Sequence, residues 1–295
     1  MNIEYLQKLW DSFSHKYTAA QKNPSVFCFT LLNMLRIEDS DSIIDAGCGG
    51  GHLHQYIIEK KKPYARFVAF DFSNQMVKIT AARMYKYLTQ QQKGSIDQIT
   101  QEEIDNVNLN SEIFNQINYS IQQANIQELN QFQDNTFDTY ISNLVFHLIP
   151  NPQQAMAEAY RILKPGGRLG ITVWGSKNNS KALTIYQEAL IKSGILEQPQ
   201  GPSKFLESTQ PIIEMAQLQG FTNIYCWTQQ NPFDNYNLED VGKFSNPEVL
   251  ELLKNAPQEK VQQFENIVQE ILNQEKQKYQ PLLLECILLV ATKAQ

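Results

Sequence analysis

The amino-acid sequence predicts an α/β fold with a doubly wound, mostly parallel sheet. Two observations support this prediction. Through the first 175 residues, short apolar or β-branched segments alternate with segments whose apolar residues repeat at helical spacing. The sequence LKPGG at residues 163–167 then stops a helical segment and turns the chain into the next strand.

Five strands are expected in this first part, with helices between them. The strands are residues 42–45, 66–70, 118–122, 139–142 and 168–173. Helical spacing is carried by Met76, Ile79, Arg83, Met84 and Tyr87, and again by Met156, Ala159, Tyr160 and Leu163. The 295 residues, 42% of them hydrophobic, are enough for one large core with an appended sub-domain.

The pattern changes after residue 174. Helices are expected at 181–193 and 209–219, a strand at 221–228, a helical stretch at 232–280 and a last strand at 286–291. Because two strands enclose the helical stretch, we expect it to be an insertion that covers the ligand edge of the sheet as a lid. The expected domains are an N-terminal helical segment (1–36), a core (37–231 with 281–295) and this insertion (232–280).

A second insertion is expected at about residues 88–117, which are rich in Gln and Asn. Thr100 and Glu103 have the spacing of a helix capping box. Because surface loops accept extra residues at little cost, we interpret this segment as a surface insert.

The composition argues against several classes of partner. The formal net charge is −6 and the pI is near 5.3, so the totals give no support for binding to nucleic acid or to an anionic membrane. The most apolar stretch, LLLECILLVA at 282–291, contains Glu285 and is shorter than the roughly 20 residues of a spanning helix. We therefore predict a buried strand there.

Cysteine usage and the start of the chain bear on the compartment. The four cysteines lie far apart with no C-x-x-C spacing, which argues against a zinc site and against a disulfide framework. The first residues, MNIEYLQKLWDSF, have acidic side chains and no long apolar run, unlike a signal or transit peptide. A cytoplasmic protein without a bound metal is expected.

The loop Asp45-Ala46-Gly47-Cys48-Gly49-Gly50-Gly51 follows a strand and opens a helix, as in nucleotide-binding folds. A dinucleotide fits poorly, because position 52 is histidine instead of the third glycine and Asp45 would repel a pyrophosphate. A cationic ligand reverses that sign. S-adenosylmethionine has an ammonium and a sulfonium but no phosphate, so Asp45 can attract its amino end while the loop amides bind its carboxylate.

These residues resemble the class I S-adenosylmethionine-dependent methyltransferases of type 11, the branch that includes the ubiquinone/menaquinone-biosynthesis-like enzymes. DAGCGGG resembles their first motif, and in FVAFDFSNQM the position of Asp71 is the one whose carboxylate holds both ribose hydroxyls. Phe72 follows at the adenine. The resemblance implies a Rossmann-like seven-stranded sheet with the last strand antiparallel, and cofactor contacts from Gly47, Cys48, Gly49, Met76, Ile126 and Asn143.

The resemblance continues towards residue 175 with one departure. ANIQEL has Asn125 where the family usually has an aspartate on the adenine amino group. An amide oxygen still accepts that hydrogen bond but is uncharged, so a lower cofactor affinity is expected. FDTYISNLVFHLIPNPQQAMAEAYRILKPGGRLGITVW then follows the family from the fourth to the fifth strand.

Residues just after the fourth strand should face the transferred methyl group. These are Asn143, Leu144 and His147. A hydroxyl or carbon acid acceptor requires a base, and His147 is our candidate; a packing histidine is an equally good interpretation. An amine or thiolate acceptor needs no base. For His52 and His54 we favour surface or capping roles.

Three aromatic residues are further candidates for the site. In the N-terminal segment WDSFSHKY, Tyr17 would contact the methionine end of the cofactor and Trp10 the substrate, although an amphipathic packing helix is the favoured alternative. Trp174 at the end of the fifth strand would line the acceptor pocket, or be a structural tryptophan.

The sequence thus predicts methyl transfer to a small organic acceptor through an oxygen, nitrogen or carbon nucleophile. The alternative is a methyltransferase-like fold that serves as a structural or regulatory subunit of a larger assembly. Methylation of protein or RNA is disfavoured by the acidic charge balance. A protein assembly partner stays open.

Overall fold

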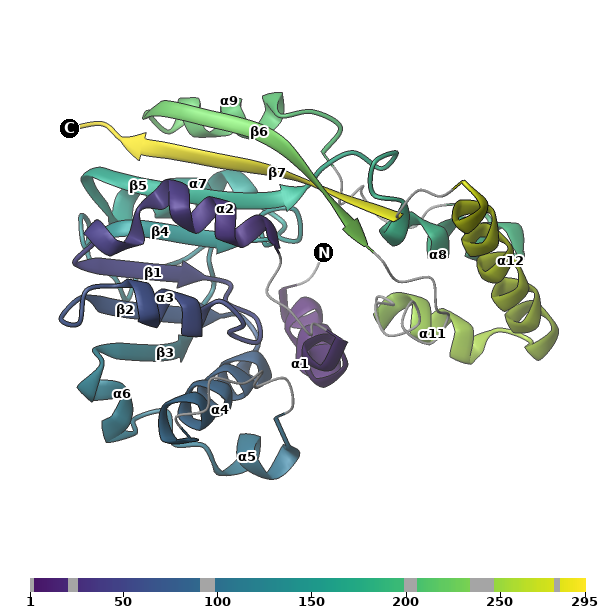
Figure 1. Cartoon of the computed structure of the whole chain (residues 1–295), viewed down its shortest axis with the longest axis horizontal. Coiled ribbons are helices and arrows are strands. Elements are labelled where there is room, and N and C mark those ends of the chain that lie inside the picture. The colour runs from purple at the N-terminus through teal and green to yellow at the C-terminus, as the bar shows by residue number, and fades with distance from the viewer. Residues whose placement is uncertain (1–2, 21–25, 91–98, 199–205, 234–246, 279–281) are drawn as a thin grey trace. The chain divides into compact units, whose positions relative to one another are not determined.

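A seven-stranded sheet with the strand order β3-β2-β1-β4-β5-β7-β6 organises the computed structural model, as Figure 1 shows. The structure describes residues 3–20, 26–90, 99–198, 206–233, 247–278 and 282–295. Six strands are parallel and the last is antiparallel, so the predicted fold class is confirmed. The strands are β1 (Ser42–Ala46), β2 (Arg66–Asp71), β3 (Tyr119–Gln123), β4 (Phe137–Asn143), β5 (Leu163–Trp174), β6 (Phe221–Phe233) and β7 (Leu282–Lys293).

Helices lie on both faces of the sheet. In Figure 1, α2 and α3 pass in front of the strands and α7 lies behind them. The helices are α1 (Ile3–Ala20), α2 (Val26–Leu35), α3 (His54–Lys60), α4 (Asn74–Gln90), α5 (Gln101–Asn106), α6 (Glu112–Gln116), α7 (Pro152–Ile162), α8 (Lys181–Lys192), α9 (Gln210–Leu218), α11 (Pro247–Asn255) and α12 (Gln258–Gln277), with a 3-10 turn η1 (Ile37–Asp39). Among the described residues, no helix combines the length and apolarity needed to cross a membrane.

The central strands are buried on both faces, which is why they appear in the sequence as continuous apolar runs. Ile43, Ile44 and Phe67 are fully buried, and β1 pairs in parallel with β2 and with β4. Asp45 lies opposite Ala69 on one neighbour and Ile141 on the other. The register therefore brings the end of β1 between two neighbouring strand ends.

The polar insertion contains two short helices, α5 and α6, that the sequence pattern did not predict. The capping box at the start of α5 is present, because Thr100 Oγ1 accepts from the Glu103 amide at 3.2 Å and Glu103 Oε2 accepts from the Thr100 amide at 2.7 Å. Ile104 is buried against Ile79 and Ala82 of α4. The insert is therefore tied to the core by a small apolar cluster.

Two compact units divide the chain. The first comprises residues 1–173, 209–227 and 287–295, and the second comprises residues 174–208 and 228–286. The second unit has its own apolar core, in which the Tyr186 ring of α8 stacks on Phe264 of α12 with their centroids 6.2 Å apart. The domain boundaries expected above and the lid role of residues 232–280 stay predictions, and residues 234–246 lie outside the described part of the chain.

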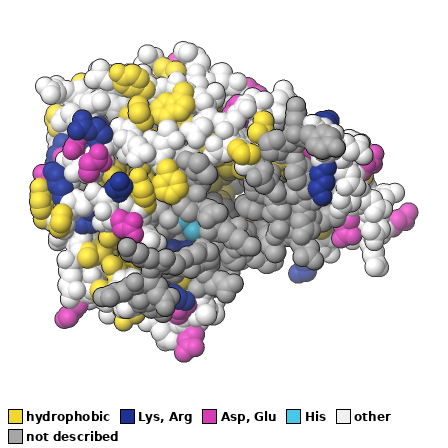
Figure 2. Space-filling model, viewed as in Figure 1, with side chains coloured by type: hydrophobic (Ala, Val, Ile, Leu, Met, Phe, Trp, Pro, Cys, Tyr) yellow, Lys and Arg dark blue, Asp and Glu magenta, His cyan; other side chains and the backbone are white. Residues whose placement is uncertain are grey.

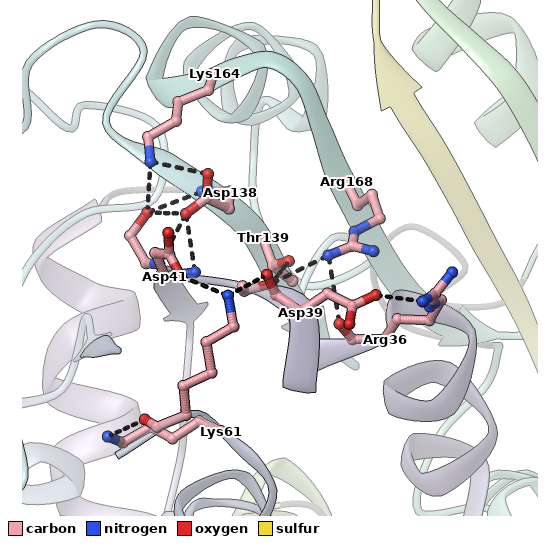
Figure 3. Close-up of polar contacts among 11 residues, drawn as sticks. Arg36, Asp39, Asp41, Lys61, Asp138, Thr139, Lys164 and Arg168 are labelled. Atoms are coloured by element: carbon pink, nitrogen blue, oxygen red, sulfur yellow. Dashed lines mark hydrogen bonds and ion pairs between the residues drawn. The ribbon is translucent and has the colours of Figure 1, made fainter. Parts of the chain in front are cut away.

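Surface charge is mixed. On the face shown in Figure 2, Lys and Arg side chains are interspersed with Asp and Glu, and no broad basic area gathers among the described residues visible there. At the end of the sheet where β1 and β4 begin, charged side chains instead form ion pairs, which Figure 3 shows. Lys164 Nζ lies 2.8 Å from Asp138 Oδ1, and Asp138 Oδ2 accepts from the Ser42 amide at 2.8 Å.

Candidate active site

A cavity opens in the first unit where β1, β2 and β4 end, with about 1150 Å³ of empty space, part of it open to solvent. This is the edge at which parallel α/β sheets bind their ligands. The lining residues come from α1, from the ends of β1, β2 and β4, from the loops that follow β1 to β4, and from the first turn of α4. They are Leu6, Trp10, Asp45, Gly47, Cys48, Gly49, Gly50, His52, Leu53, Phe70, Asp71, Phe72, Met76, Ala124, Asn125, Ile126, Gln127, Asn143, Leu144, Val145, Leu148, Ile149 and Pro150.

The glycine loop has a backbone conformation and close packing that a side chain at Gly47 would disrupt. Gly47 has a φ of 78°, and a Cβ atom there would lie 2.5 Å from a methyl group of Val145. Gly49 also has positive φ, but a Cβ there would meet nothing within 4 Å. Thr80 Oγ1 donates to the Gly49 carbonyl at 2.6 Å and holds the loop. The loop is therefore packed on one side and leaves open space for a ligand at Gly49.

Asp71 ends β2 and lines the same cavity. Its Oδ2 accepts from the Gly49 amide at 2.8 Å and its Oδ1 from the Ser73 amide at 2.9 Å. Each oxygen keeps a second lone pair, so the carboxylate can still accept two ligand hydroxyls. Burial raises the pKa of Asp71 to about 6, against the lowering effect of these amides.

Asp45 is 2% exposed and also lines the cavity. Its Oδ2 lies 3.1 Å from Nε2 of His54, whereas its Oδ1 has no hydrogen-bond partner among the residues that the structure describes. A buried carboxylate oxygen without a partner is costly unless a ligand completes it. Asp45 and Asp71 are the charged side chains among the described lining residues. Both are acidic, so the wall favours a cationic group.

His54 corrects the sequence-based interpretation. We expected a surface or capping role, but its side chain is fully buried and makes hydrogen bonds through both ring nitrogens, to Asp45 and to Tyr119. The N-cap of α3 is Leu53, which makes no side-chain capping bond. The first turn of α3 therefore points His54 into the sheet, while His52 lines the cavity.

One side of the cavity is formed by small, apolar and amide groups. Met76 and Ile126 are buried there, beside Phe72. Asn125 Oδ1 accepts from the amide of Gln127 at 3.1 Å, which closes an Asx turn and fixes the loop after β3. The substitution of aspartate by asparagine thus keeps a local structural role.

The segment after β4 turns sharply into the cavity wall. Leu144 has a φ of 57°, a conformation that is strained for leucine, and its amide donates to Thr172 Oγ1 at 3.0 Å. The Thr172 hydroxyl donates in turn to Asn143 Oδ1 at 2.5 Å. These bonds hold Asn143 and Leu144 on the cavity wall, and their predicted place beside the transferred methyl group stays a prediction.

Three predicted residues are placed differently or lie outside the description. His147 is not among the lining residues, although Val145 and Leu148 are; the turn closed by the Leu148 amide on the Val145 carbonyl presents those two neighbours instead. Trp174 belongs to the second unit. Tyr17 lies in α1, but its side chain is outside the described residues. Their catalytic or binding roles stay predictions.

The N-terminal helix reaches the cavity through a contact that the sequence did not reveal. Asp11 Oδ1 accepts from Ser73 Oγ at 2.5 Å and from the Gln75 amide at 3.3 Å, at the start of α4. A carboxylate is favourable at a helix N-terminus. This contact holds α1 so that Leu6 and Trp10 line the cavity.

Comparisons with known proteins agree with this geometry. Residues 44–171 match a family model described as a methyltransferase domain. A ubiquinone/menaquinone biosynthesis C-methyltransferase of Brucella abortus (strain S19) is 30% identical over 125 residues, which are 42% of this chain and 36% of the relative. Phosphoethanolamine N-methyltransferase 2 of Caenorhabditis elegans is 28% identical over 134 residues, 45% of this chain and 28% of the relative. The chain thus matches about a third of the length of these curated relatives.

A solved structure extends the likeness in fold. Phosphoethanolamine N-methyltransferase 2 of Haemonchus contortus, in complex with phosphomonomethylethanolamine and S-adenosylhomocysteine, superposes with a TM-score of 0.54 at 15% identity. The match covers 100% of this chain and 61% of that one. At this identity the likeness concerns the fold.

Proposed function

We propose that the protein, whose residues 44–171 match a methyltransferase domain, is an S-adenosylmethionine-dependent methyltransferase that methylates a small organic acceptor with a largely apolar body. The observation that carries the proposal is the pair of carboxylates on one cavity wall. Asp45 and Asp71 offer acceptor oxygens beside the glycine loop, and no Lys or Arg lies on the described part of that wall.

The cavity wall offers residues for both the adenosine part and the amino-acid part of the cofactor. When bound, S-adenosylmethionine supplies the methyl group. Asp71 would accept from the ribose hydroxyls and Asp45 from the amino group, directly or through water. The amides of Gly47, Cys48 and Gly49 already donate within the protein, so the glycine loop would face the amino-acid end with the open space beside Gly49. Phe72, Met76 and Ile126 would pack on the adenine.

The other part of the wall supports the acceptor class. Leu6, Trp10, Leu148, Ile149 and Pro150 give it an apolar character. A ring or chain of similar polarity would gain from burial there. A phosphate-bearing acceptor is disfavoured, because the described wall offers carboxylates and no basic side chain to pair with it. The proposal covers oxygen, nitrogen and carbon nucleophiles, and His147 stays the candidate base for the first and last.

Calorimetric titration with S-adenosylmethionine and S-adenosylhomocysteine tests the proposal. We expect micromolar binding to the wild type. Asp71→Ala should lose about 1.5–3 kcal/mol, roughly 10- to 150-fold in affinity, because charge-assisted hydrogen bonds to the ribose disappear. Asp138→Ala, at the opposite end of the sheet, is the matched control and should bind like the wild type.

Two results would contradict the proposal. Unchanged affinity in Asp71→Ala would show that the cofactor site lies elsewhere. No binding of folded wild type at millimolar cofactor would favour the alternative that the fold serves as a structural or regulatory subunit. If binding is found, a screen of apolar acceptors for S-adenosylhomocysteine release should then identify the substrate.

A further inference from the structure

Three buried side chains from different elements form a continuous hydrogen-bonded chain behind the cavity. Asp45 of β1, His54 of α3 and Tyr119 of β3 are 2%, 0% and 2% exposed. Nε2 of His54 lies 3.1 Å from Asp45 Oδ2, and Nδ1 lies 2.9 Å from the Tyr119 hydroxyl. This series of hydrogen-bonded side chains ends at Asp45 Oδ1, which has no hydrogen-bond partner within the described residues.

The chemistry of the three groups fixes the direction of the hydrogen bonds. Burial, and then the nearby Cys48 and Asp45, raises the pKa of Tyr119 well above its ordinary value, so its hydroxyl stays protonated and can donate to Nδ1. A carboxylate only accepts hydrogen bonds, so Nε2 of His54 carries a hydrogen and donates it to Asp45 Oδ2.

Aromatic rings hold the imidazole in this orientation. Phe67 packs edge-on against His54 with 4.9 Å between centroids and an interplanar angle of 81°. Phe67 and Tyr119 are themselves in contact, with centroids 5.3 Å apart. Packing on this side leaves little freedom for the histidine to rotate, and therefore little for the carboxylate that it binds.

We propose that His54 is a positioning residue: it occupies Oδ2 of Asp45 and so directs Oδ1 to the amino group of the amino-acid part of S-adenosylmethionine. This inference rests on the proposed function. It divides the recognition of the cofactor between two carboxylates. Asp71, which contacts Gly49 and Ser73 but not His54, serves the adenosine part, and the Asp45–His54–Tyr119 chain serves the amino-acid part.

Two ligands separate these parts experimentally. S-adenosylhomocysteine has both, whereas 5′-methylthioadenosine has the adenosine without the amino acid. His54→Leu should weaken S-adenosylhomocysteine by about tenfold, because Asp45 loses the donor that orients it, and should leave 5′-methylthioadenosine within about twofold. His54→Gln is the rescue variant, since its amide can donate to Oδ2, and should stay within about threefold of the wild type for both ligands.

A merely structural histidine predicts a different result. Equal losses for the two ligands in His54→Leu, or no loss for either, would overturn the proposal. If His54→Leu does not fold, Tyr119→Phe removes a single hydroxyl and should weaken S-adenosylhomocysteine selectively; equal effects on both ligands there overturn the proposal as well. A wild type that binds only 5′-methylthioadenosine contradicts this inference, whereas one that binds neither ligand contradicts the proposed function.

Discussion

The carboxylates at the two ends of the same parallel strands have different kinds of partner. Where β1 and β4 begin, a basic side chain lies within 2.8 Å of Asp39, of Asp41 and of Asp138, and Figure 3 shows these pairs. Where β1 and β2 end, Asp45 and Asp71 have imidazole and amide partners instead. The carboxylates of the first end are paired with basic side chains of the protein, whereas no Lys or Arg lies beside Asp45 and Asp71 on the described cavity wall.

The pKa values follow this difference. Burial opposes ionisation of Asp138, but the hydrogen bonds from Lys164 and Ser42 outweigh it and hold its pKa below the usual range. At Asp71 burial dominates and raises the pKa to about 6. A carboxylate kept without a cation costs stability, so the second end has the features of a binding site and the first those of a structural contact.

Two glycines with the same backbone angle give the largest expected contrast. Gly47 at the ligand end and Gly166 near the start of β5 have φ values of 78° and 77°. Gly166→Ala should cost about 1 kcal/mol from conformation alone, since its Cβ would meet nothing within 4 Å. Gly47→Ala must also displace Val145, so about 2–4 kcal/mol is expected in urea unfolding.

Of the two glycine variants, only Gly47→Ala should lose cofactor affinity as well as stability. Gly47→Ala moves Val145 on the cavity wall and should weaken S-adenosylhomocysteine binding, whereas Gly166→Ala should leave the Kd unchanged. Equal unfolding free energies for the two variants would contradict the packing argument. A weaker Kd in Gly166→Ala would contradict the separation of the two ends.

The pH dependence of binding tests the raised pKa of Asp71. The carboxylate is the form that accepts ribose hydroxyls, and it is present above the folded pKa of about 6. Affinity should therefore be level above pH 7 and fall as pH decreases through 6, by about tenfold between pH 7.5 and 5, measured by calorimetry. Asp71→Asn should bind weakly with a flat profile, and a steep profile in that variant would assign the titration to another group.

The strands of the sheet could be predicted from the sequence because buried parallel strands are short and apolar, and because segments with helical periodicity separate them. All seven strands were predicted, with boundaries mostly within a few residues of those observed. The short helices α5 and α6 were missed, because six- and five-residue helices show too few turns for a periodic pattern. The capping box at Thr100 was the local signal that α5 begins there.

The site was predictable where a motif placed a residue at a strand end, and less so where contacts join distant segments. Asp45 and Asp71 lie on the cavity wall because each ends a strand. His54 was missed because its burial depends on Tyr119, 65 residues further along the chain. Asp11 was missed for the same reason, since its partner Ser73 is 62 residues away. Sequence spacing says little about such pairs.

The smallest effect is expected at the ion pairs of the first end. Lys164→Met removes the cation from Asp138, and because the two side chains are 39% and 28% exposed, we expect a loss of about 0.5–1 kcal/mol in the free energy of unfolding. Asp138 has a lowered folded pKa, so the contribution of the pair is present above the unfolded value of about 4 and is lost as pH falls through the lower folded value.

The deficit of Lys164→Met should therefore shrink in acid and in high salt, which urea unfolding at several pH values and ionic strengths can measure. Lys62→Met, at the more exposed pair with Asp41, is the matched control and should unfold like the wild type. Both variants should bind S-adenosylhomocysteine normally. If Lys164→Met instead weakens binding, charge at one end of the strands influences the other, and the division of labour between the two ends does not hold.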